Sequence, residues 1–122
     1  MRIDELRNYC RQKPGASEDF PFDEVTLTAR VGGKIFLFTG INQGYPFRFT
    51  VKCDPDLAVQ LRKSFNDIAP GYHTNKRHWN TVTVNGSIDD EKLEWFIDHS
   101  YGIVFDSLPK NVREKIGNEK ER

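Results

Sequence analysis

Cysteine is scarce in this sequence of 122 residues, and its two copies, Cys10 and Cys53, belong to no Cys-x-x-Cys pair. Two cysteines are too few for the disulfide scaffold of a small secreted protein. An apolar run long enough to cross a membrane is also missing, and the first residues are charged rather than typical of a signal peptide. We therefore expect a cytoplasmic protein without a membrane partner.

Net charge is absent as well, because 18 basic residues balance 18 acidic ones. This excludes a strongly basic chain, which is the usual sign of a protein that binds polyanions. Acidic residues, however, are missing from residues 25–53, which hold four Lys or Arg side chains, and from residues 68–88, which hold two. Both stretches have strand-like patterns, so we expect one electropositive face on a neutral protein.

Hydrophobic residues make up only 37% of the chain, which limits it to one core. Nine Phe, four Tyr and two Trp nevertheless supply large side chains for that core. A chain of this length is most simply one domain. We expect the domain to cover residues 1–117, followed by a charged, frayed tail over residues 118–122.

The spacing of apolar residues predicts both helices and strands. Asp54-Pro55 indicates a helix start, because Asp54 can cap the helix and proline loses no hydrogen bond at the first helical position. Gly32-Gly33 predicts a hairpin turn, and Ser87 with Asp90 resembles a capping box. The expected elements are a helix over 3–13, strands over 25–31, 34–39 and 47–53, a helix from 54 to about 66, a short strand near Tyr72, a strand over 81–84, and a helix from about 90 to 108.

This order, α-β-β-β-α-β-β-α, predicts an α+β fold in the form of a two-layer sandwich. The helices cover one face of an antiparallel sheet, and the other face is open. Residues 14–23 are expected to form a loop in which Phe20-Pro21-Phe22 tucks beneath the first helix.

Alternation along the strands places one set of side chains on the open face. Large rings on such a face leave apolar area in water unless a ligand or partner covers it. A basic and aromatic sheet face suits the stacking of bases together with the neutralisation of phosphates, although a dimer interface would cover the same rings equally well. The expected set is Thr26, Thr28, Arg30, Lys34, Arg48, Thr50, Lys52, Thr81 and Thr83, with the rings of Phe36, Phe38 and Trp79.

The stretch over residues 70–84 is rich in hydrogen-bond donors and contains no carboxylate. Such a segment with flat rings close by suits an anion or a nucleic-acid strand. The plainer interpretation is a polar connection that runs into an edge strand, with Trp79 half-buried as a packing anchor. The stretch holds His73, His78, Lys76, Arg77, Thr74, Asn75, Asn80, Tyr72 and Trp79.

Catalytic and metal-binding patterns find little support in the sequence. The pair His73 and His78, with Cys53 far away, has no recognisable zinc spacing. Asp98-His99-Ser100 cannot form a catalytic triad, because consecutive side chains on a helix point about 100° apart. Cys53 falls among the apolar positions, and Gly32-Gly33 leads into a strand rather than into the helix of a phosphate loop. We therefore expect no enzyme, no metal and no cofactor.

The chain resembles the MmcQ/YjbR family of small bacterial proteins. The resemblance implies a fold like that of the type III secretion chaperones, and it implies DNA binding, since members are commonly labelled so, with a "double wing" description of the sheet and its loops. Arg77 stands where many members have lysine, which keeps the charge. The matching segments are Phe20-Pro21-Phe22, Val31-Gly32-Gly33-Lys34, Lys52-Cys53-Asp54-Pro55, the run from Pro70 to Val82, Asp98-His99-Ser100-Tyr101 and Leu108-Pro109-Lys110.

Two hypotheses follow, and they belong to different classes. The first is a sequence-tolerant DNA-binding protein that uses the sheet face and the loop over residues 70–82. The second is a chaperone-like module that binds a protein partner or a second copy of itself through the exposed rings. In the first, the candidate contacts are Arg48, Lys52, Lys76 and Arg77 to phosphates, His73, Asn75, His78 and Asn80 as donors to the backbone or base edges, and Trp79 with Phe36 as stacking rings.

Overall fold

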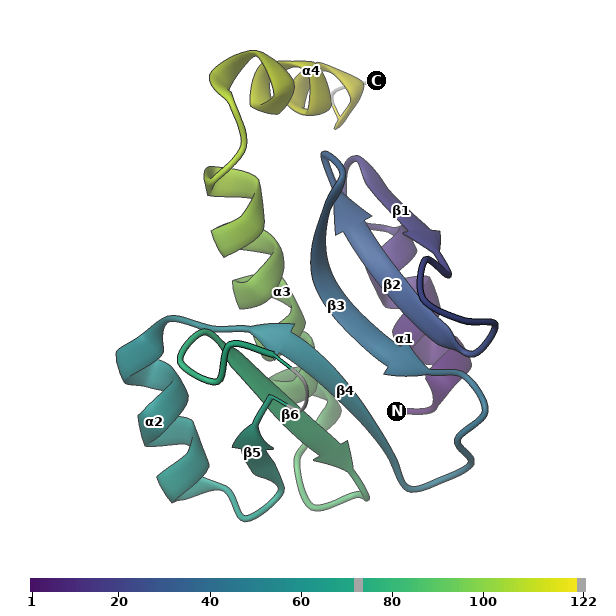
Figure 1. Ribbon diagram of the computed structural model, residues 1–122, viewed down its shortest axis with the longest axis vertical. Helices are drawn as coiled ribbons and strands as arrows, with labels where there is room; N and C mark the ends of the chain where they lie inside the picture. Colours follow the sequence, from purple (N-terminus) through teal and green to yellow (C-terminus); the bar gives the residue numbers. More distant parts are fainter. Residues whose placement is uncertain (72–73, 121–122) are drawn as a thin grey trace.

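One antiparallel sheet organises the chain (Figure 1). The computed structural model describes residues 1–71 and 74–120. In those residues the sheet has six strands in the order β1-β2-β3-β4-β6-β5, accompanied by four helices. The elements are α1 (Ile3–Arg11), β1 (Ala16–Asp19), β2 (Thr26–Val31), β3 (Lys34–Gly40), β4 (Phe47–Lys52), α2 (Pro55–Ser64), β5 (Ile68–Pro70), β6 (Trp79–Val84), α3 (Asp90–Asp106) and α4 (Lys110–Lys120).

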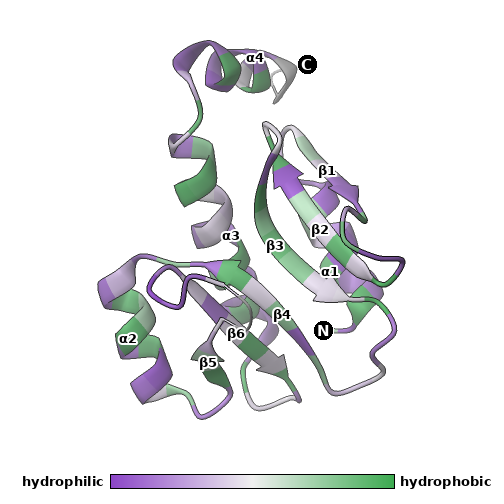
Figure 2. Cartoon of the chain, viewed as in Figure 1, coloured by the Kyte–Doolittle hydropathy of each residue, from purple (hydrophilic) through white to green (hydrophobic). Residues whose placement is uncertain are grey.

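The helices pack on one face of the sheet, which confirms the predicted α+β sandwich. Figure 1 shows α1 and α3 behind the strands, and α3 packs mainly against β3 and β4. Figure 2 shows hydrophobic residues along much of β3 and hydrophilic residues in the turn that leads into β6. The core lies between the two layers, where Leu93 and Ile97 of α3 are fully buried together with Phe47 and Phe49 of β4.

Several local signals in the sequence act as predicted. The Asp54 carboxylate accepts a hydrogen bond from the Leu57 backbone N–H at 3.2 Å, and Pro55 begins α2. Gly32 and Gly33 have φ angles of 57° and 82°, the left-handed conformation that a tight hairpin between β2 and β3 requires. The predicted Ser87–Asp90 capping box is wrong. The Ser87 hydroxyl donates instead to the carboxylate of Asp67, which lies in the loop just before β5.

The segment before β2 differs from its predicted loop. Residues Ala16–Asp19 form an additional edge strand, β1, and Glu18 in it receives hydrogen bonds from Arg7 and Arg11 of α1, each at 2.8 Å. These contacts fix β1 beside α1, and the residues that follow β1 extend away from that helix into solvent. Phe20 and Phe22 do not tuck beneath the helix; their exposed fractions are 39% and 70%.

A β-bulge overturns the predicted position of Phe36. Arg30 pairs with Ile35 but Ala29 pairs with Leu37, so Phe36 is an extra residue in β3. Phe36 and Leu37 are consequently both buried on the helix side, and the Phe36 ring meets Tyr101 edge-to-face at 5.4 Å. Ile35 and Phe38 take the open face. At the other end of the chain, α4 continues past Gly117 to Lys120.

Candidate functional site

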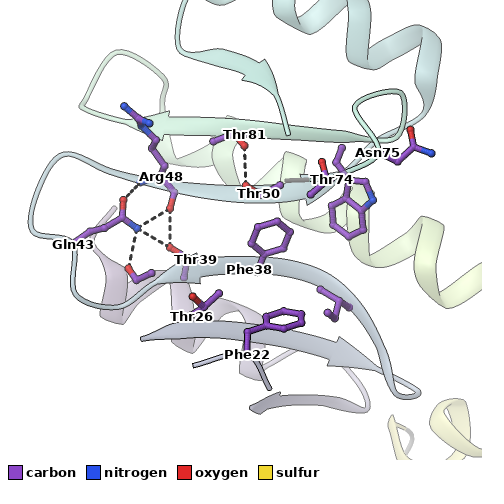
Figure 3. A pocket seen from close by; sticks show the side chains of 13 residues that line it. Phe22, Thr26, Phe38, Thr39, Gln43, Arg48, Thr50, Thr74, Asn75 and Thr81 are labelled. Atoms are coloured by element: carbon purple, nitrogen blue, oxygen red, sulfur yellow. Dashed lines mark hydrogen bonds between the residues drawn. The ribbon is translucent and has the colours of Figure 1, made fainter. Parts of the chain in front are cut away.

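The open face of the sheet is hollowed into a groove of about 680 Å³, here named the sheet groove (Figure 3). Strands β2, β3, β4 and β6 supply its floor. The loop before β2 and the turn before β6 supply its sides. Its lining residues are Phe22, Thr26, Ile35, Phe38, Thr39, Gly40, Gln43, Arg48, Thr50, Thr74, Asn75, Trp79 and Thr81.

Two aromatic rings form the centre of the floor. The rings of Phe38 and Trp79 lie 5.9 Å apart at 47° to each other, and both side chains are half-buried. Figure 3 shows the Phe38 ring between Thr50 on one side and Thr26 on the other, with Phe22 beside them. Each ring therefore keeps apolar surface that faces the groove rather than the core.

Hydroxyl groups surround these rings, and no carboxylate occurs among the lining residues that the structure describes. The hydroxyls of Thr50 and Thr81 bond each other across β4 and β6 at 2.8 Å. Asp23 lies behind Thr26, where it accepts hydrogen bonds from the backbone N–H groups of Thr26 and Val25, and these bonds lower the pKa of its carboxyl group. The negative charge of Asp23 is therefore stabilised by hydrogen bonds from its own loop.

Gln43 fixes the end of the groove at which Arg48 lies. Its side-chain amide donates to the carbonyls of Gly40 at 2.9 Å and Arg48 at 3.1 Å, and its oxygen accepts from the Arg48 backbone N–H at 2.9 Å (Figure 3). These bonds join the ends of β3 and β4 where the two strands are no longer paired. The Arg48 side chain is exposed, so its cation stands in water at this end.

The opposite end of the groove is a turn held by its own polar groups. The Thr74 hydroxyl donates to the Gly71 carbonyl at 2.9 Å, the Asn75 side chain accepts from the Arg77 N–H at 3.0 Å, and the His78 N–H donates to the Asn75 carbonyl at 3.0 Å. Gly71 is required here, because a Cβ atom would lie 2.7 Å from the Trp79 Cβ and 3.1 Å from the Trp79 carbonyl oxygen. The turn thus presents residues 74–79 against the groove.

Arg62 of α2 supports this turn from behind. Its guanidinium donates to the Asn80 side-chain oxygen at 2.7 Å and to the Trp79 carbonyl at 3.3 Å, and it also bonds the Lys76 carbonyl. Sequence reasoning missed Arg62, because a lone arginine near the end of an amphipathic helix is typical of a solvated surface. Only the packing of α2 beside β6 brings it to the turn.

The structure brings most of the predicted site residues to one side of the sheet. Arg48, Asn75 and Trp79 line the groove. Lys52 pairs with Trp79 in the β4–β6 register. It shares the open face with Arg48 and Thr50, which are four and two residues before it on β4. Lys76 and Arg77 are exposed in the turn, and within the described residues neither forms an ion pair. Arg30, in contrast, is bonded to Asp19 at 3.0 Å.

Three predicted site residues remain: Asn80, His78 and His73. Asn80 is only 2% exposed, and its amide bonds Arg62 and the Ala58 carbonyl on the helix side, so the expected exposed donor is wrong. The strand alternation in β6 turns Asn80 inward when it turns Trp79 outward. His78 is half-buried, and its carbonyl accepts from the Cys53 N–H at 2.7 Å. His73 lies outside the described residues.

The other side chains that could act in catalysis or metal binding are buried or bonded elsewhere in the fold. Burial raises the pKa of the Cys53 thiol to about 11, and within the described residues no three His, Cys, Asp or Glu side chains form a metal-like cluster. His99 stacks on Trp95 at 5.1 Å and accepts from the Asp54 N–H, while Ser100 bonds the sheet backbone. None of the helices in the described ranges combines the length and apolarity needed to cross a membrane.

Comparisons with known proteins agree with one another. The model of the YjbR family matches residues 11–103. The Escherichia coli K12 protein named "Uncharacterized protein YjbR" is 33% identical over 114 residues, which are 93% of this chain and 96% of that protein. A second relative, "Uncharacterized protein YbdF" of E. coli O157:H7, is 32% identical over 97 residues, which are 80% of this chain and 79% of that protein.

Solved structures with the same fold extend the comparison. The crystal structure of Deinococcus radiodurans protein DR2400, described by the domain name DUF419, has a TM-score of 0.88 and 38% identity, covering 94% of this chain and 87% of that one. A crystal structure from Pseudomonas syringae has a TM-score of 0.71 and 26% identity, covering 85% of this chain and 99% of that one.

Proposed function

The chain belongs to the YjbR family, and from that premise we propose that it binds DNA through the sheet groove and the turn over residues 74–79. The observation that carries the proposal is the combination of half-buried rings in a groove whose described lining holds no carboxylate with exposed cations, at the groove and in the adjacent turn, that form no ion pair within the described residues. Trp79 and Phe38 offer stacking surfaces, and Arg48 with Lys76 and Arg77 offers charge to phosphates. Phe38 takes the stacking role that the sequence suggested for Phe36.

The turn is suited to contact a phosphate backbone. Its shape is set by internal hydrogen bonds and by Arg62, so the exposed ends of Lys76 and Arg77 need not order the backbone when they bind. Asn75 uses its side-chain oxygen within the turn, so its amide N–H groups are the donors that this exposed side chain can offer to a ligand. Phosphate contacts of this kind give affinity without sequence preference.

The proposal is tested by fluorescence anisotropy with labelled DNA over a series of salt concentrations. With about four phosphates contacted, the slope of log K against log salt is expected near −3.6 for duplex DNA. The double change Lys76→Glu with Arg77→Glu removes two of these contacts, so the slope should fall to about half and the affinity by roughly tenfold or more. A slope near zero in the unaltered protein would contradict DNA binding.

The matched control is Lys110→Glu with Lys115→Glu. Both side chains are exposed on α4, away from the groove, and the pair changes the net charge by the same amount. DNA affinity should stay close to that of the unaltered protein. An equal loss of affinity in both double variants would mean that net charge, rather than this surface, governs the interaction.

A protein partner is the second candidate, and the exposure of Phe22 favours it. This ring is 70% exposed at the side of the groove. Rings at the border of an apolar hollow are typical of protein interfaces. This candidate expects binding that tolerates salt and is weakened by Phe22→Ala, whereas the DNA proposal expects binding that depends on salt and on the cations.

A further inference from the structure

We infer that the ligand of the sheet groove is single-stranded nucleic acid, whose unpaired bases enter the groove and stack on Trp79 and Phe38. This inference rests on the proposed function and narrows it. The first observation is that the two rings form the floor of a concave surface and are themselves half-buried. A ligand must therefore insert a flat apolar group into the hollow to contact them.

A base pair within a duplex cannot do this. In a duplex the faces of the bases are covered by their neighbours, and only base edges and the phosphate backbone are exposed. In a single strand each base face is accessible for stacking on an aromatic side chain. The groove volume of about 680 Å³ is in the range that accepts a compact small molecule, which suits one or a few bases and is too small to enclose a duplex.

The distribution of charge fits a strand that crosses the groove. Arg48 and Lys52 are on the same face of β4, and their separation by four residues places their Cα atoms roughly 13 Å apart. Thr50 is between them on the groove side, opposite Thr81. Phe38 is level with Thr50, between the two cations, and Trp79 is level with Lys52, so charges lie beside the rings, as in surfaces that neutralise a backbone while bases stack.

The same charges argue against a basic peptide as the occupant. The described lining contains no carboxylate that could pair with a basic peptide, and the surrounding exposed cations favour an anionic ligand. The hydroxyls of Thr26 and Thr74 donate within the protein, to Asp23 and to the Gly71 carbonyl, so toward a base they can act only as acceptors, which reads little of its edge. The expected binding is therefore tolerant of sequence.

Trp79 provides a direct measurement of base stacking. The chain has two tryptophans, and Trp95 lies on α3 at the helix side of the sheet, so Trp95→Phe leaves Trp79 as the single tryptophan, which is excited selectively over the four tyrosines. This variant is titrated with oligothymidylate, with oligouridylate, with a duplex of the same number of phosphates, and with a single strand whose nucleotides are abasic. Quenching of Trp79 by the two base-bearing single strands but not by the abasic strand is expected.

Affinity gives the second readout. Base-bearing single strands should bind roughly tenfold or more tightly than the duplex or the abasic strand, and Phe38→Leu or Trp79→Leu should remove most of that difference. Because Trp79→Leu alters a residue packed on Gly71, unfolding midpoints are measured for both variants, and Phe38→Leu keeps the test valid if Trp79→Leu does not fold. Trp95→Phe alone is the control and should bind as the unaltered protein does.

The outcomes separate this inference from the proposed function. Equal, salt-dependent binding of duplex and abasic ligand without quenching of Trp79 overturns the inference and keeps DNA binding. Quenching by oligouridylate alone supports the inference and overturns the choice of DNA. Failure of all four ligands to bind overturns both.

Discussion

At the scale of single residues, Ser100 connects the helix layer to the strands that form the groove. Its buried hydroxyl accepts a hydrogen bond from the Lys52 backbone N–H at 2.8 Å and donates to the carbonyl of Phe36, the extra residue of the β-bulge. One side chain of α3 thereby satisfies two backbone groups that the interrupted pairing of β3 and β4 leaves without partners in the sheet.

Ser100→Ala should destabilise the protein by about 1–3 kcal/mol, because it leaves a buried N–H and a buried carbonyl without partners. The measurement is urea unfolding followed by far-ultraviolet circular dichroism. Ser107→Ala is the matched control: Ser107 is exposed at the end of the same helix, where its hydroxyl donates to the Val104 carbonyl and accepts from the exposed Lys34 side chain at 3.4 Å, so we expect a change within about 0.5 kcal/mol. Similar losses in the two variants would contradict this role of Ser100.

Glu18 is the residue whose charge attaches β1 to α1. The side-chain hydrogen bond from Arg7 is the largest cause that lowers the pKa of the Glu18 carboxyl group, and Arg11 adds to it. A carboxyl group whose pKa is lower in the folded state stabilises that state above its unfolded pKa of about 4.3 and loses the contribution as the pH falls.

Glu18→Gln should therefore lower the free energy of unfolding by about 1 kcal/mol at pH 7 and have little effect near pH 3. Urea unfolding of both proteins at several pH values gives the difference. Glu24→Gln is the control, because this exposed side chain forms no ion pair within the described residues. A difference between Glu18→Gln and the unaltered protein that persists unchanged at pH 3 would disprove the electrostatic explanation.

At the scale of elements, the turn over residues 74–79 depends on α2. Arg62 bonds the carbonyls of Lys76 and Trp79, so it sets the position of the turn without facing the groove. Arg62→Gln should therefore increase hydrogen exchange at the Gly71 and His78 amides, which bond within the turn, and lower the affinity for single-stranded DNA. Exchange measured by NMR and anisotropy titrations are the two readouts.

The control for this change is Lys63→Gln, which removes one exposed positive charge from the adjacent position of α2. We expect it to leave hydrogen exchange in the turn unaltered and to change DNA affinity less than Arg62→Gln does. If both variants weaken DNA binding equally while exchange stays slow, Arg62 acts through its charge and does not position the turn.

The elements that could be predicted from the sequence are those with a local signal. The apolar spacing of α3, the Asp54-Pro55 start of α2 and the Gly32-Gly33 hairpin required no knowledge of the rest of the molecule. Strand β1 could not be predicted, because the polar sequence Ala-Ser-Glu-Asp becomes a strand only by pairing with β2 and by the arginine contacts of Glu18. The inward turn of Phe36 depends on a bulge, which shifts the alternation without any mark in the sequence.

The candidate site could also be predicted only where a local pattern in the sequence, here the alternation along a strand, places its residues. Alternation along β4 and β6 indicates correctly that Arg48, Lys52 and Trp79 share a face. The same rule, applied to β6, should have excluded Asn80, which follows Trp79 and is buried. The contributions of Phe22, Gln43 and Arg62 come from segments that meet only in the folded chain, so no sequence pattern indicates them.

At the scale of the whole molecule, the two acid-free stretches of the sequence coincide with the sheet. Residues 25–53 form β2, β3 and β4, and residues 68–88 form β5 and β6, so the acidic residues are left to the helices, β1 and the connecting loops. The two stretches therefore carry an excess of positive charge, and the rest of the chain carries an equal negative excess. This separation lets the open face attract a polyanion while the molecule as a whole remains neutral.

Both edges of the sheet are protected against pairing with another chain. The edge strand β1 has only four residues, two of which are acidic, and the edge strand β5 has three residues and ends in Pro70. Short, charged and proline-containing edges hinder the addition of further strands. Self-association through the sheet edges is consequently unfavourable, and the open face is the surface left for a ligand.

We therefore expect the protein without nucleic acid to sediment as a monomer over a wide range of concentrations. Sedimentation velocity measures this, and Phe38→Leu should leave the monomer unchanged, since the groove is then free of any partner. Concentration-dependent dimers that disappear in Phe38→Leu or Phe22→Ala would show that the rings bind a second copy, which would favour the protein-partner candidate. Dimers that persist in both variants would instead contradict the protection of the edges by β1 and β5.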